Sequence, residues 1–266
     1  MMKFKSFGAV LFVSLLTSPA GAAPLVGYQA GYSVHLSSAR DASSISAVTG
    51  KIAYGVEKLC DGWLFQQSGS MNMHLPDGNV LPQVMNFSSI ETGAKYQFSV
   101  STEGIGKEVI LGRAEMGAEG QPGQATFSRP EKKSFTLPAD TLFPAAHTRF
   151  MIDAAEAGKY QLKSHIFEGT DVDEAKLLVV FVSPMSDQGK AVIKRLGEDL
   201  KNHAGWNFRL AYFDPKSQTG EPLYEVGVDQ LDNGVALRWV LDYGTHAVEM
   251  KMVKVETLDN PDCTPK

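Results

Sequence analysis

The sequence predicts a mainly β protein built on one large antiparallel sheet. Three observations support this fold class: apolar and polar residues alternate in many short segments, turn-forming residues separate these segments, and helical patterns are scarce. One or two short helices are expected beside the sheet. A sheet of this size must close into a barrel, fold into a sandwich or curl, because unprotected edge strands tend to pair with other chains.

The chain begins with the pattern of a cleavable secretory signal peptide. Lys3 and Lys5 precede an uncharged apolar run, which small residues follow. Cleavage after Ala22 would remove residues 1–22 and leave residues 23–266 as one β domain. The apolar run is shorter than the roughly 20 residues that a membrane-spanning helix needs. The mature protein is therefore expected not to span a membrane.

The charge of the mature chain argues against two classes of partner. Without the two lysines of the signal peptide it carries 23 basic and 30 acidic residues, a net charge of −7. Nucleic acids and anionic membrane surfaces attract basic proteins. Neither is expected as a general partner.

The predicted strands follow from local patterns. The segments GYSVHLSS (31–38) and KYQFSVST (95–102) alternate strictly, which places His35 on the solvent face of its strand. Pro-Asp-Gly at 76–78 predicts a hairpin turn. The continuous apolar run at 177–182 predicts a strand that is covered on both faces.

The clearest hairpin is predicted near the C-terminus. Asn233-Gly234 is a favoured two-residue turn because both residues tolerate positive φ, and residues 224–228 and 235–241 alternate on either side of it. The sheet is expected to continue in the next segment. Its inner face would carry Val248, Met250 and Met252.

One helix is predicted with a clear start and end. Pro144 can open it and Gly158 can close it. A second helix is favoured over residues 187–202, where apolar residues recur at steps of four. His147 lies at the start of the first helix, where it could cap the helix, bond to the backbone or line a cleft. Capping is favoured, because free N–H groups at a helix start need polar partners.

Cys60 and Cys263 are the two cysteines of the chain. Exported proteins fold in oxidising compartments, so a disulfide between them is the favoured interpretation. It would tie the C-terminal tail to an early strand. A free or intermolecular thiol and a reactive cysteine remain as alternatives, although Glu57 and Asp61 beside Cys60 do not favour a thiolate.

Motifs that would indicate catalysis or a metal site were not found. The glycine-rich segment 104–112 lacks the spacing of a phosphate-binding loop, and the acidic segment 168–176 lacks the ligand pattern of a calcium loop. The first is interpreted as a turn and the second as a solvated acidic turn. The six histidines are scattered, unlike the ligands of a zinc site. No catalytic residue, metal or cofactor is predicted.

Large apolar residues could line the concave face of a curled sheet and bind an apolar ligand. Filling of the protein core is the simpler role for them, because large residues dominate cores. The candidate lining residues are Trp63, Phe98, Trp206, Trp239, Met250 and Met252.

Four segments, residues 50–67, 129–159, 210–214 and 222–244, carry a resemblance to a known family. The longest contains KSFTLP, then LFPAAHT and a helix that ends in Ala-Gly. Together they resemble the EipB-like cell-envelope integrity proteins, which are exported proteins of Gram-negative bacteria. The resemblance extends over residues 28–263.

The resemblance implies a spiral-like, broken β-barrel in the periplasm, closed by a disulfide between Cys60 and Cys263. It implies a non-catalytic role in envelope integrity through protein contacts, with a periplasmic tetratricopeptide-repeat protein as one kind of partner. It supplies no catalytic residues and no role for His147. The alternative function is a lipid or lipoprotein carrier that uses the concave apolar face. An unrecognised hydrolase is least favoured, because no nucleophile and base can be named together.

Overall fold

One sheet of fifteen strands runs through the residues described by the structure, a computed structural model that covers residues 24–41, 43–104, 106–197 and 200–264. The predicted signal peptide, residues 1–22, lies outside these ranges. The order of the strands is β8-β7-β6-β5-β4-β3-β2-β1-β15-β14-β13-β12-β11-β10-β9. Neighbouring strands are antiparallel, except that β9 and β10 are parallel.

The strands are β1 (Tyr28–Ala39), β2 (Ala47–Lys58), β3 (Trp63–His74), β4 (Val80–Thr92), β5 (Lys95–Glu103), β6 (Glu108–Glu115), β7 (Gly123–Arg129), β8 (Lys133–Leu137), β9 (Thr141–Leu142), β10 (Gln161–Ile166), β11 (Lys176–Pro184), β12 (Gly205–Phe213), β13 (Tyr224–Leu231), β14 (Ala236–Asp242) and β15 (His246–Thr257). The α-helices of the described residues are α1 (Pro144–Glu156) and α2 (Asp187–Leu196).

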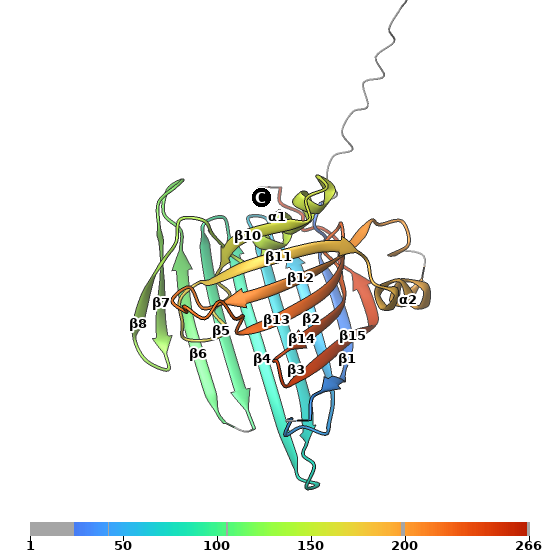
Figure 1. The fold of residues 1–266 in the computed structure, drawn as a ribbon. Helices are drawn as coiled ribbons and strands as arrows, with labels where there is room; N and C mark the ends of the chain where they lie inside the picture. The colour runs from blue at the N-terminus through green and yellow to red at the C-terminus, as the bar shows by residue number, and fades with distance from the viewer. Residues whose placement is uncertain (1–23, 42, 105, 198–199, 265–266) are drawn as a thin grey trace, which may run out of the picture.

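The sheet consists of two walls that meet at its centre. Strands β1 to β8 form the first wall and β10 to β15 form the second, and the walls join where β1 pairs with β15. The strands of the second wall cross in front of the first at a steep angle (Figure 1). The two edge strands, β8 and β9, are separated by only three residues of chain but do not pair with each other. The result is a nearly closed, barrel-like sheet with an open seam, which confirms the predicted curled, broken barrel.

Alternation along each strand separates an inner face from an outer face. In β1, the side chains of Tyr32 and Val34 point inward and are 2% and 3% exposed. His35 points outward, where it contacts the carboxylate of Glu249 in β15. A strand with one buried face needs apolar residues at every second position. The alternation predicted for residues 31–38 is thereby confirmed.

Helix α1 begins at Pro144, as predicted, but a residue of the opposite wall caps it. Glu91 at the end of β4 accepts hydrogen bonds from the backbone N–H groups of Ala145 (2.7 Å) and Ala146 (3.0 Å). A carboxylate at this place satisfies free N–H groups and interacts favourably with the helix dipole. Burial raises the pKa of Glu91, although these two hydrogen bonds oppose the shift. The predicted capping role of His147 is wrong, because Glu91 occupies that position.

His147 lies inside α1, with its imidazole buried in the protein. The residue is 2% exposed, and its Nε2 atom has no hydrogen-bond partner among the described residues. Burial lowers the pKa of His147 to about 4, because the charged imidazolium would lose its hydration. The helix packs on the inner face of β10 to β13 through Met151, Ile152, Ala154 and Ala155.

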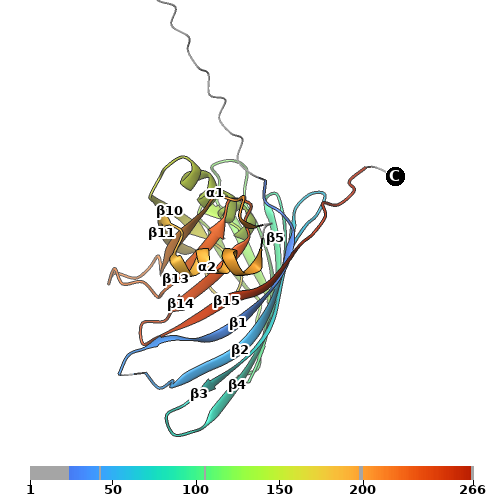
Figure 2. The same ribbon diagram turned by 90° about the vertical axis from the view of Figure 1, so that its right-hand side faces the viewer.

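Helix α2 packs on the outer face of the second wall, over β14 and β15 (Figure 2). The hydroxyl of Ser186 caps it by accepting from the N–H of Gly189 (3.0 Å), and it donates to the completely buried Asp229 of β13 (2.6 Å). The helix ends at Leu196, before the predicted end at residue 202. Gly197 breaks it, because its φ of +114° is not helical.

The run at 177–182 forms strand β11, but it is not covered on both faces. Leu178 and Val180 point inward and are completely buried, whereas Phe181 points outward and is 48% exposed. Helix α1 covers only the inner face of this strand. The prediction that this strand is covered on both faces is therefore wrong.

The hairpin between β13 and β14 has a longer loop than predicted. Only Gly234 has positive φ (+88°), and Asn233 does not. The N–H of Leu231 donates to the carbonyl of Val235, and the pairing shifts register after Asp229. One left-handed glycine next to a register shift is typical of a loop with a bulge, rather than a two-residue turn.

Cys60 and Cys263 form a disulfide, as predicted. Their Cα atoms lie 5.4 Å apart, and 203 positions of sequence separate them. Cys60 is in the turn between β2 and β3, and Cys263 follows β15, so the bond ties the C-terminal segment to the first wall. Both residues are exposed.

We expect loss of the disulfide to lower stability without changing the fold, because the bond joins two exposed segments. Loop entropy sets an upper limit of about 5 kcal/mol on the effect. The comparison is between the melting temperature of the wild type and that of the double variant Cys60→Ser/Cys263→Ser, each with and without reductant. Reductant should lower the melting temperature of the wild type alone. Equal melting temperatures for the oxidised wild type and the double variant would contradict the expectation.

Burial of neutral His147 should make the protein less stable in mild acid. The unfolded chain binds a proton at this histidine below about pH 6.5, whereas the folded chain resists it down to about pH 4. Stability should therefore fall by about 3 kcal/mol as the pH drops through this window. Urea unfolding of His147→Gln between pH 4 and pH 7 should show a weaker pH dependence. The control is His74→Gln at the tip of β3, and an identical slope in wild type and His147→Gln would rule out this account.

Candidate functional site

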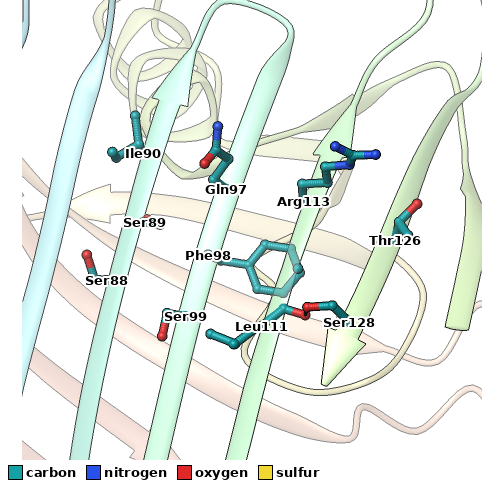
Figure 3. A pocket seen from close by; sticks show the side chains of 11 residues that line it. Ser88, Ser89, Ile90, Gln97, Phe98, Ser99, Leu111, Arg113, Thr126 and Ser128 are labelled. Carbon is teal, nitrogen blue, oxygen red and sulfur yellow. Dashed lines mark hydrogen bonds between the residues drawn. The ribbon is translucent and has the colours of Figure 1, made fainter. Parts of the chain in front are cut away.

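A shallow groove crosses the outer face of the first wall. Its first part lies over β4 to β7 and has a volume of about 580 Å³. Figure 3 shows the side chains that these strands direct into it. They are Ser88, Ile90, Gln97, Ser99, Leu111, Arg113, Thr126 and Ser128.

A second part of about 610 Å³ continues over β15 and β1 to β5. Both parts are lined by Ser88 and Ser99, so they form one continuous surface, called here the outer groove. The hydroxyl of Ser68 donates to the side-chain oxygen of Asn86 in its floor (2.7 Å). The other outward positions here are Gln29, Gly31, Ala53, Gly55, Gln66 and Ser101.

The outer groove mixes apolar surface with hydroxyl and amide groups and carries few charges. Among its lining residues only Arg113, Lys254 and Glu256 are charged. Hydroxyl and amide groups supply most of its donors and acceptors. The sequence prediction missed this surface, although serine and glutamine recur at the outward positions of residues 66–70 and 97–101. The sequence shows this pattern in each segment, but it does not show that these strands lie side by side in the sheet.

The six residues predicted to line a concave face all lie on the inner side of the sheet. Phe98 is 4% exposed and Met252 is completely buried, so these two fill the core. The remaining four are partly exposed: Trp63, Trp206, Trp239 and Met250. That this face binds a ligand stays a prediction.

Partly exposed apolar side chains continue along the inner side toward the tips of β3 and β4. Trp239 pairs with Met250, which pairs with Val34, and Met71 lies on the same row of neighbouring strands. Beside Thr148 of α1, the inner space narrows to a hollow of about 40 Å³ that Tyr54 and Trp239 also line. The inner apolar face is defined here as Tyr54, Met71, Met73, Phe87, Trp239 and Met250.

The loop between β10 and β11 passes between the two walls. The hydroxyl of Tyr96 in β5 donates to the main-chain oxygen of Glu168 (2.8 Å). Phe167 is buried beside it, and Gly169 has a φ of +68°. A Cβ atom at Gly169 would lie 2.4 Å from the ring of Phe98, so only glycine fits there. These contacts fix the backbone of Glu168 inside the curl.

The carboxylate of Glu168 keeps some accessible surface, and no described residue donates a hydrogen bond to it. Burial, followed by the charge of Asp171, raises the pKa of Glu168 to about 7. The segment predicted as a solvated acidic turn is exposed at Thr170 and Asp171, whereas Glu168 is only partly accessible. Burial also raises the pKa of four tyrosines from both walls, and the charge of Glu168 adds to the shift: Tyr54, Tyr96, Tyr212 and Tyr224.

The other carboxylates of this loop have cationic partners. Lys176 of β11 contacts Asp173 and lies 3.9 Å from Asp171. Lys216 pairs with Glu174 at 2.5 Å. Glu168 has no such partner among the described residues.

The described part of the chain contains no group of three or more histidine, cysteine, aspartate or glutamate side chains placed to hold a metal ion. None of the helices in that part is both long and apolar enough to cross a membrane.

Comparison with known proteins places the chain in a family. The profile of the EipB-like family matches residues 19–259. The chain is 27% identical over 248 residues to the cell envelope integrity protein EipB of Brucella abortus (strain 2308), covering 91% of this chain and 88% of that protein. A crystal structure of a β-barrel-like protein of a domain of unknown function from Brucella abortus shares the fold, with a TM-score of 0.79, 24% identity, and coverage of 90% of this chain and 100% of the other. Because the family profile spans most of the sequence, this chain belongs to the EipB-like family.

Proposed function

We propose that this protein is an exported, non-catalytic protein of the periplasm that maintains cell-envelope integrity through contacts with another protein. The secretory pattern of residues 1–22 supports export. The relative from Brucella abortus is named a cell envelope integrity protein, which supports the cellular role.

The outer groove is the observation that carries the proposal of protein contacts. Sites for small molecules are usually deep and mostly apolar. The outer groove is instead shallow and broad, and hydroxyl and amide groups are scattered through its apolar surface. Protein interfaces are depleted of charge at their centre, and their hydrogen bonds are shared across the contact. The groove therefore suits the surface of a macromolecule better than a small ligand.

A periplasmic tetratricopeptide-repeat protein is the partner that we propose. Repeat proteins stack helix pairs into extended concave surfaces. A surface of that shape can follow the curved outside of the first wall over several strands.

Charge placed in the outer groove should abolish partner capture without unfolding the protein. We expect Ser88→Arg/Ser99→Arg to lose at least nine-tenths of the partner recovered by cross-linking in whole cells. An unpaired charge in the centre of an interface costs several kcal/mol, whereas outward positions of a strand tolerate arginine. The matched control, Gln161→Arg/Ser183→Arg, places the same two charges on exposed positions of β10 and β11 in the second wall. If the wild type and both variants capture the same partner, the outer groove is excluded as the contact surface. If the wild type captures no protein, the result counts against a function through protein contacts.

A second candidate function is a periplasmic lipid or lipoprotein carrier. The inner apolar face supports it, because Trp239, Met250 and Met71 remain partly exposed although they point into the curl. Apolar surface that stays accessible inside a barrel is a common place for an apolar ligand.

Native mass spectrometry of protein purified from the periplasm, followed by organic extraction, tests the carrier function. A lipid or lipopeptide bound at one per protein is expected if the protein is a carrier. Substitution of Met71 and Met250 by glutamine should then reduce its occupancy, because the face becomes polar. A mass equal to that of the protein without ligand, measured on protein from cells that contain the candidate lipids, would favour the function through protein contacts.

A further inference from the structure

The inner side of the sheet also carries a carboxylate, that of Glu168. No described residue forms an ion pair or a hydrogen bond with this carboxylate. The nearby lysines contact Asp171, Asp173 and Glu174 instead. Burial of an unpaired carboxylate is costly, since it loses hydration without a compensating cation. The backbone contacts with Tyr96 and the close approach at Gly169 nevertheless hold the residue there.

Aromatic residues of both walls surround Glu168: the hydroxyl of Tyr96 bonds to its main-chain oxygen, and its charge acts on three further tyrosines. Tyr54 comes from β2 and Tyr96 from β5, while Tyr212 and Tyr224 stack on each other in β12 and β13 with ring centroids 4.5 Å apart. Aromatic faces attract cations such as ammonium groups through their quadrupole, and the attraction is strongest away from water. Carboxylate and tyrosines together are the usual surroundings of a bound amine.

The aromatic region is continuous with the inner apolar face. Tyr54 pairs with Gln67 across β2 and β3, and Met71 lies two inward positions further along β3. This separation corresponds to about 13 Å of strand, which a twelve-carbon chain spans. A molecule with its head near Glu168 would therefore place its tail against the methionines.

We propose that the inner side binds an amphiphile with a cationic amine head group, held by Glu168 and the surrounding tyrosines, with its apolar tail along Met71 and Met250. This inference rests on the carrier function and names the chemical class of its ligand. Of the two ligands that the carrier function allows, we propose a free lipid and not a lipoprotein. The groups that face Glu168 besides the tyrosines are Asp171 of its own loop and, through Asp171, Lys176 of β11.

Three probes with the same twelve-carbon tail test the inference: dodecyltrimethylammonium, dodecyl sulfate and dodecyl maltoside. Binding below the micelle concentration can be followed by tryptophan fluorescence, because Trp239 lies on the inner apolar face. The wild type should bind the ammonium probe at least tenfold more tightly than the maltoside at pH 8. That preference should decline as the pH falls through about 7, because Glu168 takes up a proton there.

Two variants of one loop separate a specific carboxylate from general charge. Glu168→Gln should remove both the preference for the ammonium probe and its pH dependence, while it remains folded because burial disfavours the charged form. Glu174→Gln removes the same charge from the group that pairs with Lys216 and should retain the preference. Equal losses in both variants would overturn the inference. If all three probes bind equally well to the wild type and to Glu168→Gln, the inference is overturned and the carrier function remains. If no probe binds, both the inference and the carrier function are rejected.

Discussion

The pairing of β1 with β15 is the constraint on which the rest of the structure depends. It joins residues 28–39 to residues 246–257, and it is the contact that turns two separate meanders into one sheet. The inner apolar face crosses this joint, because Met250 of β15 stands beside Val34 of β1. The outer groove crosses it as well, since Lys254 is the neighbour of Gly31. Both candidate surfaces are therefore complete only when the joint is formed.

Two carboxylates on the inner side of the sheet show how differently the fold treats the same group. Glu91 is satisfied by two N–H groups of α1 and thereby links the first wall to the helix of the second. Glu168 is held equally firmly by its backbone, but its carboxylate receives no hydrogen bond from the described residues. The hydrogen bonds to α1 explain why a carboxylate is tolerated at Glu91. No comparable contact explains the carboxylate of Glu168. Groups that break the rules of stability in this way tend to mark functional sites.

Local patterns in the sequence were sufficient for much of the fold. The strand at 31–38 could be predicted because one buried face imposes period two, and α1 could be predicted from Pro144 and Gly158. The disulfide could be predicted because the secretory pattern at the N-terminus favours pairing of the two cysteines. The cap on α1 could not be predicted, because Glu91 lies 54 residues from the N–H group it accepts. The inward position of Glu168 and the outer groove also depend on contacts between distant strands, which one sequence does not reveal.

The central position of β15 has a consequence for how the protein is made. A chain is synthesised from its N-terminus, so β1 is made long before its partner β15. Until the last strand arrives, β1 presents an unpaired edge of twelve residues, and such an edge is prone to pair with other chains. Contacts between the most distant segments also form slowly. Incorporation of the β1 edge into the complete sheet therefore has to wait for synthesis of the C-terminal strand.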